Sequence, residues 1–174
     1  QSEPTGFLPP ADAALVDAAL TEANSAFEAQ RGDLLERLNE EILRLGKSFG
    51  VLRLEKVKLN WVAQMRLEKG GQATSFSKLT AGERLRLRIA TAIALIRVGR
   101  ERGVGRHPGL LIIDSPGAEE TSDSDLATLL GELKQIAGET QGLQILIASA
   151  DAPAVLSALG KDRCRVAAAG AYLW

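Results

Sequence analysis

Apolar residues recur at intervals of three and four between residues 11 and 45, which is the spacing of one face of a helix. Gly32 interrupts this pattern and weakens the case for one unbroken helix. The segment fits either an amphipathic helix on a core or the returning arm of a coiled coil, since its heptads are too few to decide. The apolar positions are Ala14, Leu15, Ala18, Ala19, Ala26, Leu34, Leu35, Leu38, Ile42 and Leu45.

Beyond residue 48 the pattern changes from helical spacing to rough alternation. Apolar and charged residues alternate over 49–67, which predicts two short antiparallel strands around Asn60, and Gly70-Gly71 predicts a turn. Residues 76–80 lead into a predicted helix from about Ala81 to Arg102. Its predicted buried stripe is Leu85, Ile89, Ala92, Ile93 and Ile96.

The remaining pattern is that of an α/β protein. The all-apolar run 110–113 is typical of a strand buried on both faces of a parallel sheet, and 143–148 predicts a second buried strand. Helices are predicted over 125–137, with Ser124 or Asp123 as cap, and over 153–159. One or two final strands are expected over 165–173, and the Pro- and Gly-rich residues 1–10 predict a flexible lead-in.

Composition narrows the class of protein. The 174 residues are 45% hydrophobic and 25% charged, with a net charge of −1, so any DNA contact must come from a local patch. No apolar run reaches the roughly 20 residues that span a bilayer, and no signal peptide is recognised. The single cysteine, Cys164, excludes an internal disulfide and fits a reducing compartment, so a cytoplasmic location is expected. Because the chain begins at Gln1, we expect it to be a piece of a longer polypeptide.

The first candidate site is Leu79-Thr80-Ala81-Gly82-Glu83, at the start of the predicted helix over 81–102. The first amides of a helix lack internal partners and carry partial positive charge, and small residues let a phosphate approach them. The alternative is a plain helix start, in which Thr80 and Glu83 form a capping box.

The second candidate is Asp114, which directly follows the apolar run 110–113. A carboxylate at the carboxyl end of a buried strand lies where open α/β sheets bind ligands, and such an aspartate holds Mg²⁺ in phosphoryl-transfer sites. The alternative is an exposed Asp that opens the Asp-Ser-Pro-Gly turn.

Together these motifs give residues 49–174 a resemblance to the C-terminal lobe of an ABC-type ATPase head. The resemblance is to the branch with long coiled coils, the structural maintenance of chromosomes (SMC) proteins and related DNA-repair ATPases. Residues 79–83 resemble the ABC signature, 110–114 the Walker B strand, 119–123 the D-loop, and 143–149 the strand before the switch histidine. Residues 11–48 would then be the stub of the coiled-coil arm. The implied fold is mostly parallel strands flanked by helices, with an antiparallel hairpin.

The resemblance implies an ATP site shared between two heads. Thr80 and the amides of Ala81 and Gly82 would meet the γ-phosphate of ATP held by a second head, and Asp114 would position Mg²⁺ in cis. Ser115, Ser122 and Asp123 would line the nucleotide with Leu79 and Glu83. The implied partners are an N-terminal Walker A lobe of the same or another polypeptide, a second head, and DNA in the full complex, with no membrane.

The sequence departs from this family pattern in three places. Ser115 stands where the family has the glutamate that positions water, and Glu119 or Glu120 would have to substitute for it. Ser149 or Ala150 stands where the family has its switch histidine. Ala81 replaces a glycine, which is a mild change. Slow hydrolysis, or a variant catalytic arrangement, is therefore expected.

Other candidate sites are weaker. Gly46-Lys47-Ser48 resembles the end of a phosphate-binding loop, but the full pattern needs glycine at position 41, which is Glu41. His107 lies in a Gly/Pro loop without metal-ligand neighbours, and Cys164 is interpreted as a packing residue. Seven arginines fall between residues 84 and 106, which is consistent with ion pairs, phosphate support or DNA contact.

The sequence thus predicts half of an ATPase head, incomplete as an enzyme without Walker A. Its work would be to couple ATP binding and hydrolysis to head engagement and DNA-related movement, in repair, chromosome organisation or phage defence. The alternative is a non-catalytic dimerisation or scaffold module with a degenerate ATP site.

Overall fold

The computed structural model describes residues 10–103, 107–116 and 123–167. The chain divides into two compact units, Gln1–Glu36 and Arg37–Trp174. Helix α1 (Pro10–Ser48) continues through Gly32 without a break. All described side chains from residue 13 to residue 30 are exposed, whereas buried side chains begin at Leu38. The core of the second unit therefore takes in only the last three turns of α1.

The antiparallel hairpin predicted around Asn60 is confirmed. Strand β1 (Leu54–Leu59) pairs with β2 (Met65–Lys69), and β2 pairs with a third strand, β3 (Gln72–Ser75), that the sequence pattern did not predict. Gly70 and Gly71 form the turn between β2 and β3 with φ of +59° and +74°, which explains the glycine pair. Leu54, Val57 and Leu67 bury one face of this sheet.

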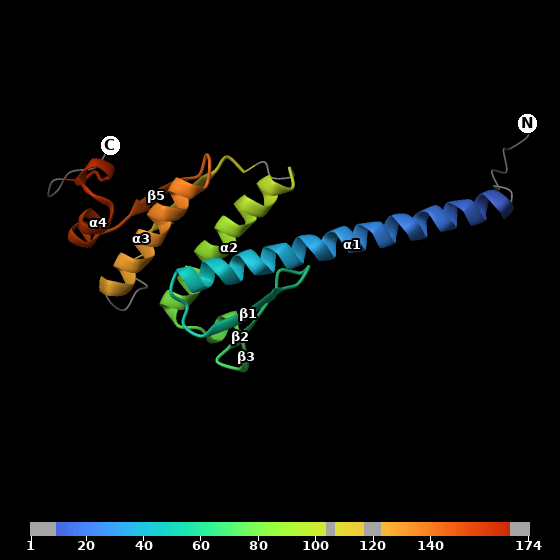
Figure 1. The fold of residues 1–174 in the computed structure, drawn as a ribbon, viewed down its shortest axis with the longest axis horizontal. Coiled ribbons are helices and arrows are strands. Elements are labelled where there is room, and N and C mark those ends of the chain that lie inside the picture. Colours follow the sequence, from blue (N-terminus) through green and yellow to red (C-terminus); the bar gives the residue numbers. More distant parts are fainter. Residues whose placement is uncertain (1–9, 104–106, 117–122, 168–174) are drawn as a thin grey trace, which may run out of the picture. The chain divides into compact units, whose positions relative to one another are not determined.

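Helix α2 (Ala81–Glu101) is the central helix of the second unit. A short 3₁₀ turn (Phe76–Lys78) precedes it, and it lies between the last turns of α1 and α3 (Asp123–Glu139) (Figure 1). Four of the five predicted stripe residues are buried, and Leu87, Ala90, Ala94 and Val98 are buried as well. Burial on more than one side accounts for the weak amphipathic pattern of this helix.

Strands β4 (Leu110–Asp114) and β5 (Gln144–Ala148) form the predicted parallel pair. The prediction that both faces are buried is wrong for this chain. Ile113 is buried, but Ile112 and Leu146, which face each other in the register, are 65% and 57% exposed. Helix α3 packs against β5, and among described residues nothing covers the face that carries Ile112 and Leu146.

The C-terminal region is helical rather than stranded where it is described. Helix α4 (Ala152–Leu159) is capped by Asp151, whose side chain accepts a 3.0 Å hydrogen bond from the amide of Ala154. A 3₁₀ turn follows at Lys161–Arg163. The strands expected over 165–173 are absent at residues 165–167, and the rest of that range lies outside the described residues.

Candidate functional site

The turn at Thr80 starts α2 with a complete capping box. The amide of Glu83 donates to the Thr80 hydroxyl at 3.3 Å, and the Glu83 carboxylate accepts from the Thr80 amide at 3.2 Å. The capping alternative is therefore present. It occupies the Thr80 amide but leaves the amides of Ala81 and Gly82 without a partner inside the helix. Thr80 and Ala81 are exposed, whereas Gly82 is buried.

Contacts of Lys69, Leu79 and Arg84 fix the position of this turn. Lys69 on β2 pairs with Glu83, Leu79 is 5% exposed, and Arg84 donates to the Leu79 carbonyl at 2.8 Å. Burial by itself would raise the pKa of Glu83, but the hydrogen bonds from Lys69 and Thr80 outweigh it and leave that pKa below its ordinary value. The Arg88 guanidinium lies 5.8 Å from the centre of the Phe76 ring. Leu79 and Glu83 thus act as anchors of the turn.

Asp114, Ser115 and Ser149 lie together at the carboxyl ends of β4 and β5. Asp114 is paired with Ala148 in the register, and the Ser115 amide donates to the Ala148 carbonyl at 2.8 Å. Asp114 and Ser115 are exposed, and the Ser115 hydroxyl donates to one Asp114 carboxylate oxygen at 3.0 Å. Ser115 has φ of +50°, which is uncommon for a residue with a side chain and is found mostly at special sites.

The other predicted site residues divide between described and undescribed parts. The Ser149 hydroxyl accepts from the amide of Asp151 at 3.1 Å, so it belongs to the turn that caps α4. Asp123 begins α3, and its side chain lies outside the described residues. Because α3 begins at Asp123, both Asp123 and Ser124 are inside the helix rather than capping it as predicted. Glu119, Glu120 and Ser122 lie outside the described residues.

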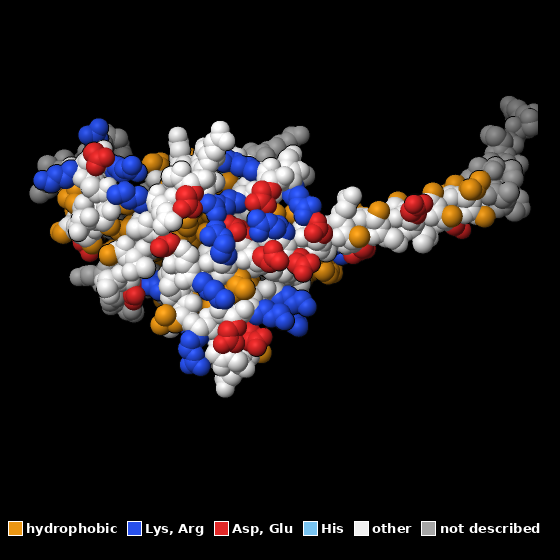
Figure 2. All heavy atoms as spheres, viewed as in Figure 1, with side chains coloured by type: hydrophobic (Ala, Val, Ile, Leu, Met, Phe, Trp, Pro, Cys, Tyr) orange, Lys and Arg blue, Asp and Glu red, His pale blue; other side chains and the backbone are white. Residues whose placement is uncertain are grey.

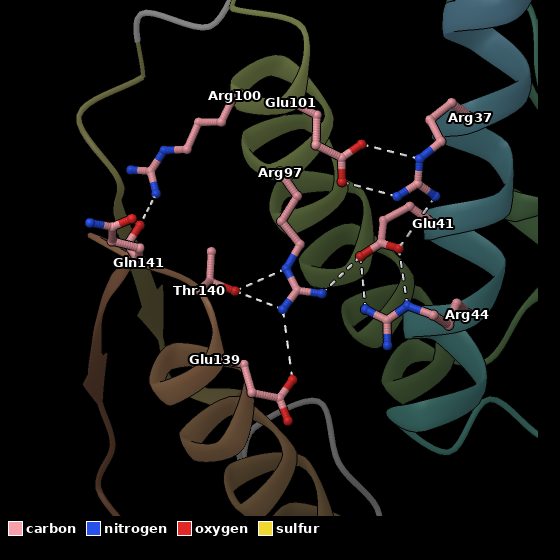
Figure 3. Close-up of a pocket in the computed structure, with 9 residues that line it drawn as sticks. All are labelled: Arg37, Glu41, Arg44, Arg97, Arg100, Glu101, Glu139, Thr140 and Gln141. Atoms are coloured by element: carbon pink, nitrogen blue, oxygen red, sulfur yellow. Dashed lines mark hydrogen bonds and ion pairs between the residues drawn. The ribbon is translucent and has the colours of Figure 1, made fainter.

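A cluster of ion pairs joins α1, α2 and the end of α3, and sequence reasoning missed it. Glu41, whose side chain is 5% exposed, accepts two hydrogen bonds from Arg44 at 2.8 and 3.0 Å and one from Arg97 at 3.0 Å (Figure 3). Arg97 also donates to the Thr140 hydroxyl at 2.7 and 2.9 Å and lies 3.8 Å from Glu139. We call these five residues the Arg97 cluster.

The Arg97 cluster lies in a pocket of about 680 Å³. Hydrogen bonds from Arg44 lower the pKa of Glu41 to about 2, with a further contribution from Arg97, although burial opposes the shift. Figure 2 shows Lys and Arg side chains interspersed with Asp and Glu side chains on one face of the second unit. Arg37 pairs with Glu101 at 3.0 Å, and Arg100 donates to the Gly142 carbonyl at 3.2 Å. Because each of the four arginines already has an acceptor, the pocket ties three helices together rather than offering free cations.

The remaining sequence candidates have local partners. The Nδ1 atom of the exposed His107 accepts from the Gly109 amide at 3.1 Å, and Cys164 is half-buried, 4.0 Å from the Val155 carbonyl. Within the described ranges, no group of three His, Cys, Asp or Glu side chains is placed to hold a metal ion. None of the described helices is long and apolar enough to span a bilayer.

Comparisons with known proteins show which solved structures have a similar fold. No protein-family profile and no curated protein matches the chain. Among solved structures, an SMC protein described under ATP-driven dimerisation and DNA-stimulated activation of SMC ATPases aligns with a TM-score of 0.52 and 11% identity, over 71% of this chain and 73% of that one. An Smc head bound to the C-terminal winged-helix domain of ScpA aligns with 0.50 and 12% identity, over 71% and 37%.

The SMC head domain of Thermotoga maritima also aligns, with a TM-score of 0.47 and 18% identity, over 71% of this chain. The chain spans 40% of that head domain. At these identities the likeness concerns the fold. The chain therefore has an α/β fold similar to that of SMC heads, as the resemblance implied.

Proposed function

We propose that the chain is the C-terminal half of an SMC-like ABC ATPase head, which supplies the signature turn and the Walker B aspartate to an ATP site completed by a Walker A lobe. The observation that carries the proposal is the pairing of an exposed, small-residue helix start at Thr80-Ala81 with an exposed Asp114 at the carboxyl end of a parallel strand. The first offers amides to an anion, and the second offers a carboxylate to a cation.

The open sheet supports the need for a second lobe. Leu110, Ile112 and Leu146 are 37%, 65% and 57% exposed on one face of the β4–β5 pair. Parallel sheets are ordinarily covered on both faces, because each exposed apolar side chain forgoes burial worth about 1.5–3 kcal/mol. A Walker A lobe of the same or a partner polypeptide would bury this face.

Asp114 and its neighbour fit a magnesium site. The Asp114 carboxylate and the Ser115 hydroxyl are hard oxygen ligands of the kind that Mg²⁺ takes, together with water and substrate phosphates. Bound Mg²⁺ would neutralise charge on the phosphates of ATP. The Thr80 hydroxyl and the exposed Ala81 amide would stabilise the γ-phosphate of a nucleotide on the second head, while Glu119 or Glu120 would orient water. ATP would thus join two heads, and hydrolysis would release them, moving the helical arms on or around DNA.

The second candidate is a non-catalytic dimerisation or scaffold module. Ser115 in the place of a glutamate and Ser149 in the place of a histidine favour it, because a neutral serine carries no charge to the γ-phosphate. The two candidates are separated by mixing the chain with its Walker A lobe and measuring phosphate release. Turnover that disappears in Glu119→Gln or Glu120→Gln excludes the scaffold, whereas ATP-driven association without turnover favours it.

A further inference from the structure

The side chain of Arg86 is buried and contacts two segments far from it in the chain. Arg86 lies on α2 and is 7% exposed. One terminal nitrogen of its guanidinium donates to the Gly50 carbonyl at 3.0 Å, and the other lies 3.4 Å from Oδ1 of Asp125. Gly50 follows the end of α1, and Asp125 lies in the first turn of α3. One guanidinium therefore joins α1, α2 and α3.

This arrangement is costly, because a buried guanidinium must recover a large desolvation cost through its partners. Gly50 has φ of +82°, a backbone conformation that favours glycine. A planar fork reaches two acceptors in different directions, which lysine cannot do. A second polar contact, from Ser48 to Glu132, joins the end of α1 to α3 nearby.

Arg86 is on the helix that begins at the Thr80 turn, and its partner Asp125 is on the helix that follows Asp114 in the chain. Arg86 is four residues, about one helical turn, after Gly82 of the signature turn. In the proposed function Asp114 and the Thr80 turn serve different nucleotides, because Asp114 acts on its own head and the Thr80 turn acts on the second head.

We propose that Arg86 is a positioning residue that fixes the Thr80 turn relative to the start of α3, so that the two ATP sites served by one lobe respond together. This inference rests on the proposed function. Without the Arg86 fork, nucleotide at one site would no longer be sensed at the other. Head association would then need more ATP and would lose cooperativity.

The test uses the full-length protein with both lobes. Head association is followed by sedimentation velocity against Mg-ATP concentration, and the urea midpoint is measured for every variant. Arg86→Met removes the charge at similar volume, Arg86→Lys keeps the charge without the fork, and Asp125→Asn removes the acidic partner. Lys134→Met, an exposed site on α3, is the matched control, and Leu133→Ala is a core change that lowers stability while keeping both Arg86 and Asp125.

We expect Arg86→Met to raise the ATP concentration for half-maximal association about tenfold, with a lower Hill coefficient. Arg86→Lys should have a smaller effect, Asp125→Asn should act in the same direction, and the double variant should be no worse than Arg86→Met alone. Lys134→Met should behave as wild type.

The inference is overturned if Arg86→Met associates like wild type, or if Leu133→Ala raises the ATP requirement equally at an equal urea midpoint. If Arg86→Met does not fold, the ATP requirement of Asp125→Asn tests the inference instead. The Asp125 side chain is 44% exposed, so this substitution should disturb folding less. A wild-type protein that fails to associate with ATP overturns the proposed function and this inference with it. If the wild-type protein associates with ATP and the Arg86 and Asp125 variants need no more ATP than wild type, the inference is overturned but the proposed function stands.

Discussion

Arg97 on α2 donates a 3.0 Å hydrogen bond to Glu41 on α1, although the two residues are separated by 56 positions in the chain. The Glu41 side chain is almost fully buried, and Arg44 provides its remaining hydrogen bonds. Because Arg97 also binds Thr140, the last turns of α1 are joined through α2 to the end of α3.

Replacing Glu41 with alanine is expected to destabilise the lobe strongly. The change leaves the guanidinium groups of Arg44 and Arg97 partly buried without their carboxylate, which costs about 3 kcal/mol. Urea unfolding at pH 7 measures this loss. Glu40→Ala is the matched control. Glu40 is exposed and forms a long, 3.9 Å ion pair with Arg37, and such an exposed pair contributes less than about 1 kcal/mol. Equal, small losses in the two variants would show that the Arg97 cluster adds no stability.

The same carboxylate predicts acid sensitivity. The folded pKa of Glu41, about 2, lies below its ordinary value of 4.5, so the ionised form is bound more tightly in the folded state. Its stabilisation is complete above about pH 5 and is lost as the pH falls towards 2. Glu83, whose pKa is also lowered, acts in the same direction. Urea midpoints measured from pH 7 to pH 3 should fall less steeply in Glu41→Gln than in wild type, and parallel curves would contradict this assignment.

Substitutions at Thr80 separate capping from phosphate binding. Thr80→Asp keeps an N-cap oxygen and should change stability by only a few tenths of a kcal/mol, whereas Thr80→Ala should cost about 1 kcal/mol. The aspartate, however, puts a negative charge where the γ-phosphate is expected. Thr80→Asp should therefore abolish ATP-driven head association at wild-type stability, as measured by sedimentation and urea unfolding.

Thr80→Ser is the control for this pair, since it keeps both the cap and the hydroxyl. Wild-type association in Thr80→Asp would show that Thr80 serves only to cap α2. Loss of association in Thr80→Ser would point instead to a requirement for the threonine methyl group.

Charges on the open sheet face should block assembly without unfolding the lobe. Ile112→Glu and Leu146→Glu alter side chains that are 65% and 57% exposed, so each should change stability by less than about 0.5 kcal/mol. A charge there would be buried by a Walker A lobe and should prevent co-purification with it. Lys134→Glu, on the exposed side of α3, is the control. Unimpaired co-purification would mean that this face stays open.

Local patterns were sufficient to predict much of this fold. The glycine pair at 70–71, the alternation around Asn60 and the period of residues 81–102 are short-range signals, and the structure has the hairpin and helix they predict. β3 was missed because Gln72–Ser75 is short and half exposed, without the β-branched or aromatic run that marks a strand. The prediction that both faces of the strand 110–113 are buried was wrong. An apolar run does not show whether the segment that covers it belongs to the same chain.

Candidate site residues were predictable only where a motif is local. The Thr80 turn and Asp114 each stand at the end of one element, and the strand register brings Ser149 close to Asp114. Arg86 and the Arg97 cluster depend on partners more than 30 residues away, as in the separation of 36 between Arg86 and Gly50. Pairing at that distance is set by how helices pack, so the charge pattern favoured ion pairs on a solvated face but could not identify the partners.

Calorimetric titration with Mg-ATP is the most direct test of the split site. The chain alone should bind Mg-ATP more weakly than about 1 mM, because its amides and Asp114 lack the loop that grips the phosphates. After the Walker A lobe is added, binding should become tight, and Asp114→Asn should weaken it. Tight binding of Mg-ATP by the chain alone would contradict the account.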